Sequence, residues 1–100
     1  MIVRNFGAVT LFLLAGCVAA HVPEPTAELA PPGADLGRLR RGRSLYVNRC
    51  SGCHRLHDVE RFTDVEWGRA VQDMIHEAKV KLTEAENGDL LDYLTTFNTK

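Results

Sequence analysis

Three residues in the middle of the chain carry chemistry at a fixed spacing: Cys50, Cys53 and His54, in the run Cys50-Ser51-Gly52-Cys53-His54. Two thiols three positions apart can each add to one vinyl group of the same porphyrin, and the imidazole that follows can then bind the iron. The small residues Ser51 and Gly52 let the backbone pass close to the porphyrin edge. The C-x-x-C-H spacing therefore predicts one covalently attached c-type haem, with His54 as an axial ligand of its iron.

Two other kinds of site use the same residue types. A thioredoxin-like redox pair places C-x-x-C between a strand and a helix, but no strand-like run precedes Cys50. A structural zinc site needs four ligands, usually with a second pair of cysteines or histidines. Beyond Cys50, Cys53 and His54 the chain offers only scattered histidines. A redox disulfide and a zinc site stay open as alternatives to haem.

The second axial position of the iron would decide between electron transfer and ligand chemistry. Met74 is the predicted sixth ligand, because it shares a helical face with Trp67 and Val71. His76 is the alternative, and it lies about 200° round a regular helix from Met74, so the two cannot both face the iron. Met74 is the one methionine of residues 17–100, and a single methionine is also a common filler of core gaps. An iron site without a sixth ligand from the protein therefore stays open as well.

The N-terminus has the pattern of an export signal. A single positive charge, Arg4, precedes the uncharged apolar residues 6–15, a run too short to span a bilayer as a mature helix. The run ends in Leu14-Ala15-Gly16-Cys17, which resembles the bacterial lipoprotein box, where cleavage precedes a cysteine that is then lipidated. By this resemblance, residues 1–16 are a signal peptide and Cys17 carries acyl chains. Cleavage farther along the chain is the alternative.

An acylated Cys17 would anchor the protein on the periplasmic, extracytoplasmic side of a bacterial membrane. Two or three acyl chains give stable anchoring, and lipidation accounts for the one cysteine that a haem leaves over. Valine, not aspartate, follows Cys17, and by resemblance to the sorting rule of Gram-negative lipoproteins this favours the outer membrane. Residues 17–34 hold four prolines and no apolar period. They are predicted to form an extended, lipid-anchored tether in which His21 has no expected role.

Residues 35–100 have the pattern of a helical domain. Asp35 is a suitable N-cap for a helix that runs into Cys50. Two capping boxes, Thr63-Asp64-Val65-Glu66 and Thr83-Glu84-Ala85-Glu86, predict the starts of two more helices. No alternation of valine and isoleucine indicates a strand. We therefore predict an all-α domain of three to four helices around one covalently bound haem.

The run Gly42-Arg43-Ser44-Leu45-Tyr46 ahead of C-x-x-C-H resembles the N-terminal helix of small class I c-type cytochromes. In that family a glycine and an aromatic residue one turn later meet the C-terminal helix at a steep angle, and Gly88 is the expected contact of Gly42. The resemblance covers about residues 42–97, and it implies that the haem is attached outside the cytoplasm. The chain departs from the family in having no Gly-Pro after the motif and only 20 residues from His54 to Met74.

The charges are unevenly distributed, although the formal net charge is -1 at pH 7. Residues 35–62 carry seven arginines and three acidic residues, whereas residues 63–100 carry eight acidic and four basic residues. A basic rim around the haem would steer an acidic redox partner. Alternatively, the arginines pair with the haem propionates and with the acidic helices. Nucleic acid is not an expected partner, because the predicted compartment is wrong and aromatic residues do not interleave with the arginines.

Together these features predict a membrane-tethered electron carrier that exchanges electrons with redox partner proteins and is not itself an enzyme. Two alternatives stay open. One is a haem-based gas or redox sensor with an open or displaceable sixth site, and the other is a permanent haem subunit of a larger oxidoreductase complex. A carrier predicts a low-spin spectrum, whereas a sensor predicts a high-spin or mixed-spin spectrum and fast binding of CO.

Overall fold

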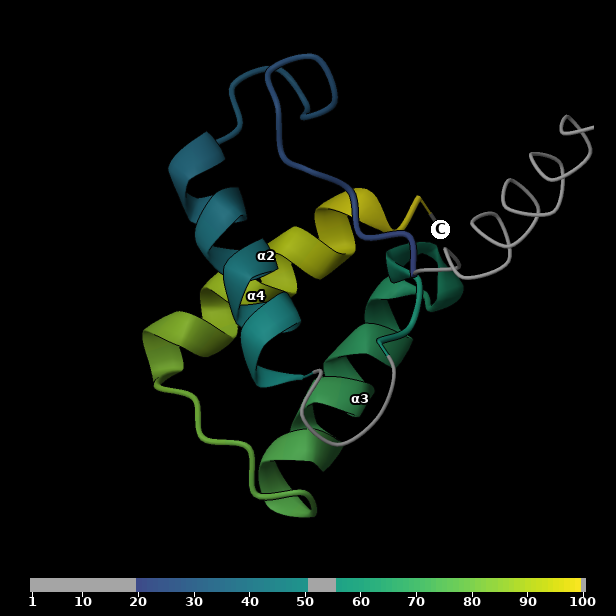
Figure 1. The fold of residues 1–100 in the computed structure, drawn as a ribbon, viewed down its shortest axis with the longest axis vertical. Coiled ribbons are helices and arrows are strands. Elements are labelled where there is room, and N and C mark those ends of the chain that lie inside the picture. The colour runs from purple at the N-terminus through teal and green to yellow at the C-terminus, as the bar shows by residue number, and fades with distance from the viewer. Residues whose placement is uncertain (1–19, 51–55, 100) are drawn as a thin grey trace, which may run out of the picture.

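The computed structural model describes residues 20–50 and 56–99. Along these residues the elements are the helix α2 (Leu36–Arg49), the 3-10 turn η2 (Val59–Arg61), α3 (Asp64–His76) and α4 (Glu84–Phe97), as Figure 1 shows. No strand occurs in this part of the chain, so the all-α prediction is confirmed for it. No helix among these residues is both long enough and apolar enough to cross a membrane.

Each helix begins at the residue that its N-cap predicts. The Asp35 side chain accepts a hydrogen bond of 3.1 Å from the backbone N–H three residues on. Before α3, Thr63 Oγ1 accepts from the Glu66 N–H at 3.2 Å, and Glu66 Oε1 accepts from the Thr63 N–H at 2.9 Å. Thr83 and Glu86 form the same reciprocal capping box before α4. All three predicted helix starts are therefore confirmed.

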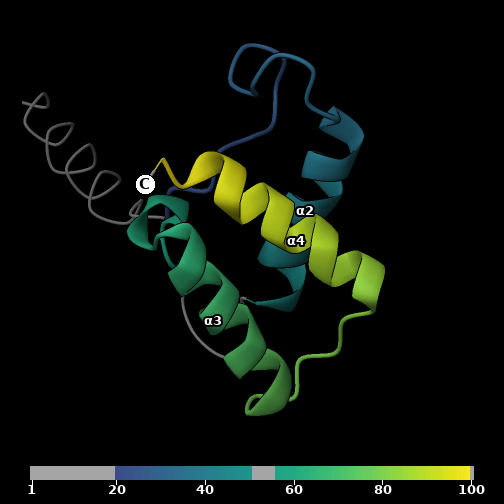
Figure 2. The same ribbon diagram turned by 180° about the vertical axis from the view of Figure 1, so that it is seen from behind.

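The helices α2 and α4 cross in close contact (Figures 1 and 2). A Cβ added at Gly42 would lie 2.2 Å from the carbonyl oxygen of Asp89 and 2.6 Å from Cβ of Tyr93, so only glycine allows this approach. The predicted contact, Gly88, is wrong by one position. A Cβ there would meet the guanidinium of Arg38 at 3.2 Å, because successive residues of a helix point about 100° apart.

The buried core draws on all three helices and on η2. Its apolar members are Leu39, Tyr46, Cys50, Val59, Trp67, Val71, Leu90, Tyr93, Leu94 and Phe97. The rings of Tyr46 and Trp67 meet edge to face with centroids 5.6 Å apart, and Phe62 meets Trp67 in the same way at 4.9 Å. These aromatic contacts join the C-terminal half of α2 to the start of α3.

Residues 17–34 stay predicted as a lipid-anchored tether, but residues 21–25 of this segment are bound to the helical domain. Val22 is half-buried against the core, and Pro25 is fully buried. The hydroxyl of Tyr93 donates a hydrogen bond of 2.7 Å to the carbonyl oxygen of Pro23. Proline has no N–H to pair, so Pro23 and Pro25 need partners only for their carbonyl groups, and side chains of α4 and α2 supply them. We call residues 21–25 the strap.

Candidate functional site

Cys50 is the one residue of the C-x-x-C-H motif that lies within the described residues. It follows the last residue of α2, its N–H donates to the carbonyl oxygen of Tyr46 at 3.2 Å, and it is buried. Burial raises the pKa of the Cys50 thiol. Reactive cysteines are accessible and have lowered pKa values, and Cys50 by itself has neither property. Cys17, Cys53 and His54 lie outside the described residues.

Two buried aromatic side chains hold the segment that follows the motif. The hydroxyl of Tyr46 donates to the carbonyl oxygen of His57 at 2.6 Å, and Nε1 of Trp67 donates to the carbonyl oxygen of Val59 at 2.8 Å. Burial raises the pKa of Tyr46 above its ordinary value, so its hydroxyl remains a neutral donor at physiological pH. Residues 57–59 are therefore fixed to the core within a few positions of the predicted ligand His54.

A hollow of about 550 Å³ lies beside the C-terminal end of α2. It is lined by Arg49, Ile75, Lys79, Val80, Lys81, Leu82, Thr83 and Glu86. These residues come from the last residue of α2, the last turn of α3, the α3–α4 connection and the first turn of α4. The lining thus includes the residue directly before the motif, although Cys50 itself is buried in the core and is not part of the lining. Its volume falls within the range of about 300–1,000 Å³ that small-molecule and cofactor sites have.

The lining of this hollow fits a haem chemically. Ile75, Val80 and Leu82 offer apolar contact to the face of a porphyrin. Lys79 and Lys81 offer positive charges to its propionate groups. Among residues 20–50 and 56–99 no three histidine, cysteine or acidic side chains gather as a metal site.

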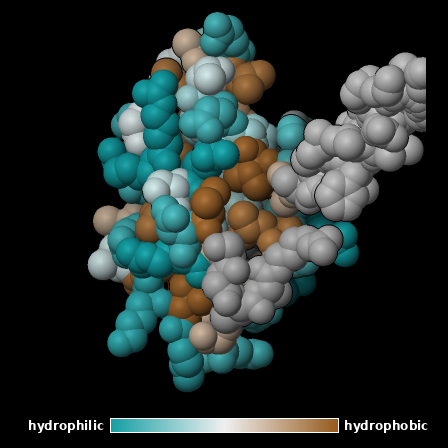
Figure 3. Space-filling model, in the orientation of Figure 1, coloured by the Kyte–Doolittle hydropathy of each residue, from teal (hydrophilic) through white to brown (hydrophobic). Residues whose placement is uncertain are grey.

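Apolar side chains around the core stay only partly covered. They are Val22, Ala30, Ala34, Leu45, Leu56, Phe62, Ala70, Met74, Ile75, Leu82 and Leu91. Apolar side chains also gather near the middle of the face seen in Figure 3, within a surface that is otherwise mainly hydrophilic. A domain of this size buries a modest fraction of its surface, so a bound cofactor would add apolar contact that the protein lacks.

The two candidate sixth ligands occupy different surroundings on α3. Met74 is half-buried and packs against the core. Ile75, the next residue, belongs to the lining of the hollow, and Met74 does not. His76 is exposed, and its Nε2 lies 3.2 Å from Oε1 of Gln72 on the same helix. The structure thus keeps Met74 on the inner side of α3 and His76 on the outer side, and ligation by Met74 stays a prediction.

Arginines of α2 form ion pairs with acidic residues of α4. Nε of Arg38 lies 2.6 Å from Asp92 Oδ2 and 3.1 Å from Asp89 Oδ1. Arg49 lies 3.2 Å from Glu86 Oε2. Each pair is partly exposed and contributes little stability by itself. These contacts support the interpretation in which the arginines pair with the acidic helices.

One polar residue near the hollow is absent from the sequence-based predictions. Oδ1 of Asn87 is buried and has no hydrogen-bond partner. The residue follows Glu86, which lines the hollow. A buried acceptor without a partner costs free energy and calls for an explanation. The burial of Asn87 was predictable from the sequence, because Asn87 precedes Leu90 and Leu94 by three and seven positions and so shares their buried helical face.

Comparison of the chain with protein-family models, with curated proteins and with solved structures finds no match. The resemblance to class I cytochromes therefore depends on the motif and on the helix pattern of this chain alone.

Proposed function

We propose that the chain is a membrane-anchored c-type cytochrome that carries single electrons on the extracytoplasmic side of a bacterial membrane. One observation carries the proposal: the C-x-x-C-H motif follows a helix whose Gly42 is in close contact with the C-terminal helix. Cys50 and Cys53 would hold the haem through thioethers, and His54 would bind its iron. When bound, the haem supplies one-electron transfer between the ferrous and ferric states of its iron.

Residues of the chain would hold the motif in place and keep water from the cofactor. Tyr46 and Trp67 bond the carbonyl groups of His57 and Val59, and these bonds fix the segment after the motif. Ile75, in the hollow, would contribute to an apolar shell, which limits solvent access and so affects the reduction potential.

The remaining parts of the proposal concern the sixth ligand, the anchor and the partners. Met74 is the proposed sixth ligand, since a methionine thioether raises the potential of a haem with a histidine ligand. Cys17 is the proposed site of lipid attachment. Redox partner proteins would bind at the haem edge through small, weak contacts. The protein would act as a carrier and not as an enzyme.

A haem-based sensor with an open or displaceable sixth site is the second candidate. One observation favours it: Ile75, and not Met74, is among the residues that line the hollow. A haem subunit of a larger oxidoreductase complex would use the same chemistry as the carrier, and it would differ by purifying together with a large partner.

Absorption spectra of the exported, purified protein separate these functions. A carrier predicts covalent haem, a low-spin spectrum and a weak thioether-to-iron band that Met74→Ala abolishes and His76→Ala preserves. A wild-type protein with a high-spin spectrum and rapid binding of CO to its reduced form would be a sensor. Full covalent haem in His54→Ala or Cys53→Ser would contradict the proposed attachment, and an unchanged spectrum in Met74→Ala would contradict the proposed ligand.

A further inference from the structure

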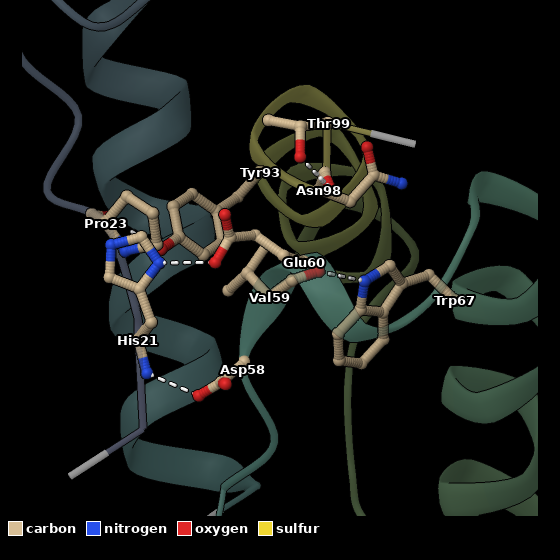
Figure 4. A network of polar contacts seen from close by, with 9 residues as sticks. All are labelled: His21, Pro23, Asp58, Val59, Glu60, Trp67, Tyr93, Asn98 and Thr99. Atoms are coloured by element: carbon tan, nitrogen blue, oxygen red, sulfur yellow. Dashed lines mark hydrogen bonds and ion pairs between the residues drawn. The ribbon is translucent and has the colours of Figure 1, made fainter.

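The strap is bound to the domain from its first side chain, although His21 was expected to have no role. Figure 4 shows His21 beside the segment Asp58–Glu60. The N–H of His21 donates to Asp58 Oδ1 at 2.6 Å, and its Nδ1 lies 2.7 Å from Glu60 Oε1. The carbonyl oxygen of His21 accepts from the N–H of Val59 at 3.0 Å. Three polar contacts thus hold this one residue to the residues around η2.

The rest of the strap is bound to the helices. Tyr93 of α4 donates to the carbonyl oxygen of Pro23 at 2.7 Å, and Nε of Arg40 of α2 donates to that of Pro25 at 3.3 Å. The Pro25 side chain is fully buried. Because contacts run along the strap, the chain belongs to the folded domain from His21 onward.

The fixed strap shortens the connection between the domain and the proposed lipid anchor. Only three residues separate Cys17 from His21. Four Cα–Cα steps span at most about 15 Å. A free tether reaching to Asp35 would span at most about 68 Å over its 18 steps. An acylated Cys17 would therefore hold the His21 end of the domain close to the membrane.

The surface at this end has an apolar feature that suits a lipid contact. A hollow of about 260 Å³ is lined by His21, Pro23, Leu29, Glu60, Thr96, Phe97 and Thr99. The side chain of Leu29 is 62% exposed. Exposed leucines beside a lipid anchor can enter the boundary between headgroups and acyl chains, where burial of apolar area strengthens binding.

We infer that this face of the domain, which we call the strap face, rests on the lipid bilayer. The inference depends on the lipid anchor at Cys17 that the proposed function includes. In Figures 1 and 2 the described chain starts beside the C-terminal end of α4, and the α3–α4 connection lies at the other end of that helix. The 14 residues of α4 span about 21 Å. The hollow beside the C-terminal end of α2 would thus lie away from the lipid, where soluble redox partners have access to it.

Thiol labelling of the full, haem-loaded protein tests this orientation. In the proposed protein Cys17 is acylated, and Cys50 and Cys53 are bound to the haem. An introduced cysteine is therefore the one free thiol. Leu29→Cys probes the strap face, and Ala78→Cys, at an exposed position of the α3–α4 connection outside the hollow, probes the far end. Each is measured with a bulky water-soluble maleimide, once in phosphatidylcholine vesicles and once as a soluble protein in which a cleavable export signal that leaves no cysteine replaces residues 1–17. We expect the vesicles to slow labelling of Leu29→Cys severalfold and to leave the labelling rate of Ala78→Cys unchanged.

A spacer provides the matched control for the length of the connection. A flexible Gly-Ser insertion of about 12 residues before His21 adds roughly 20 Å of mean reach and leaves the strap residues intact. It should restore fast labelling of Leu29→Cys in vesicles. Labelling of Leu29→Cys at equal rates in vesicles and in solution would overturn the inference. Slow labelling in solution as well would also overturn it, because another copy of the chain or another protein would then cover the strap face.

The mass of the purified protein separates failure of this inference from failure of the proposed function. A chain without acyl groups on Cys17 contradicts the lipid anchor and overturns the inference with it. An acylated chain in which Leu29→Cys reacts freely overturns the orientation alone and leaves the proposed cytochrome untouched.

Discussion

The contact between α2 and α4 and the region around the end of α3 differ in how completely the protein fills them. Gly42 brings the two helix backbones together, and pairs such as Arg38 with Asp89 flank the crossing. At the end of α3, Met74 and Ile75 are only half-buried, beside a hollow of about 550 Å³. At Gly42 the α2–α4 contact leaves no room for a Cβ, whereas the end of α3 has apolar surface to offer to a bound group. The following predictions test this difference.

The largest effect is expected from Gly42→Ala. The new Cβ would lie 2.2 Å from a backbone oxygen of α4, so the two helices must move apart. Overpacking of this kind costs about 3 kcal/mol of the free energy of unfolding, a large part of the total for a small domain. Urea unfolding followed by circular dichroism measures the loss.

Gly68→Ala is the matched control for this substitution. Gly68 lies within α3, and an added Cβ there meets nothing within 4 Å. Alanine should therefore raise the free energy of unfolding by up to about 1 kcal/mol through helix propensity. If Gly42→Ala unfolds at the same urea concentration as Gly68→Ala, the close contact of α2 and α4 is wrong.

A smaller effect is expected from Tyr46→Phe. The substitution removes a hydrogen bond of 2.6 Å to the part-buried carbonyl oxygen of His57, at a cost of about 1 kcal/mol. Because this bond holds the segment after the motif, we also expect a lower yield of covalent haem. Pyridine haemochrome spectra per mole of purified protein measure the yield.

Tyr93→Phe separates these two consequences. The Tyr93 hydroxyl binds the carbonyl oxygen of Pro23 in the strap, away from the motif. Its loss should lower the free energy of unfolding by a similar amount and leave the haem yield unchanged. Equal haem yields in Tyr46→Phe and Tyr93→Phe would show that the Tyr46 bond contributes to stability only.

The hollow predicts an effect of Ile75→Ala that depends on the haem. In a haem-free form carrying Cys50→Ser and Cys53→Ser, Ile75→Ala should lower the free energy of unfolding by about 1 kcal/mol. This loss is smaller than that for a fully buried isoleucine, because Ile75 is only half-buried. With haem covering the side chain, the cost should rise towards the range of about 2–5 kcal/mol seen in cores. Urea unfolding of both forms gives the two values.

Val71→Ala is the control for this dependence, because the protein alone already buries Val71 and leaves only 3% of it exposed. Its cost should be the same in the haem-free and haem-loaded forms. An equal cost of Ile75→Ala in the two forms would mean that the haem does not cover this hollow.

The helix starts were predictable from the sequence because their chemistry is local. Asp35, Thr63 and Thr83 each bond a backbone N–H three residues away, and such pairs can be identified in a short stretch of sequence. The glycine at the crossing was also identifiable, since a glycine inside a helix indicates a close approach. Its exact partner was not, because a shift of one position in α4 depends on the packing of the whole helix pair.

The docked strap could not be predicted for a different reason. Its contacts join residues far apart in the chain, such as Tyr93 with Pro23, which are 70 positions apart. A proline-rich composition without apolar period is typical of a free linker, and composition carries no information about which distant side chains will bond its carbonyl groups. The hollow beside the C-terminal end of α2 likewise arises only when the ends of three helices meet.

The smallest effect is expected from Glu86→Gln at the rim of the hollow. The hydrogen bond from the Thr83 N–H lowers the pKa of Glu86, and Arg49 lowers it further. The folded pKa is therefore below the unfolded value of about 4.3, so the carboxylate adds stability above that pH and loses it as the pH falls through the folded pKa. Thermal unfolding between about pH 7 and pH 3 should show a small deficit in stability for Glu86→Gln at neutral pH, and this deficit should close as the pH falls.

Glu84→Gln is the control, because it removes a carboxylate from the same turn and keeps the capping box, so its deficit in stability should be smaller. A deficit for Glu86→Gln that stays constant down to pH 3 would mean that the Arg49 side of the hollow is not held by this charge.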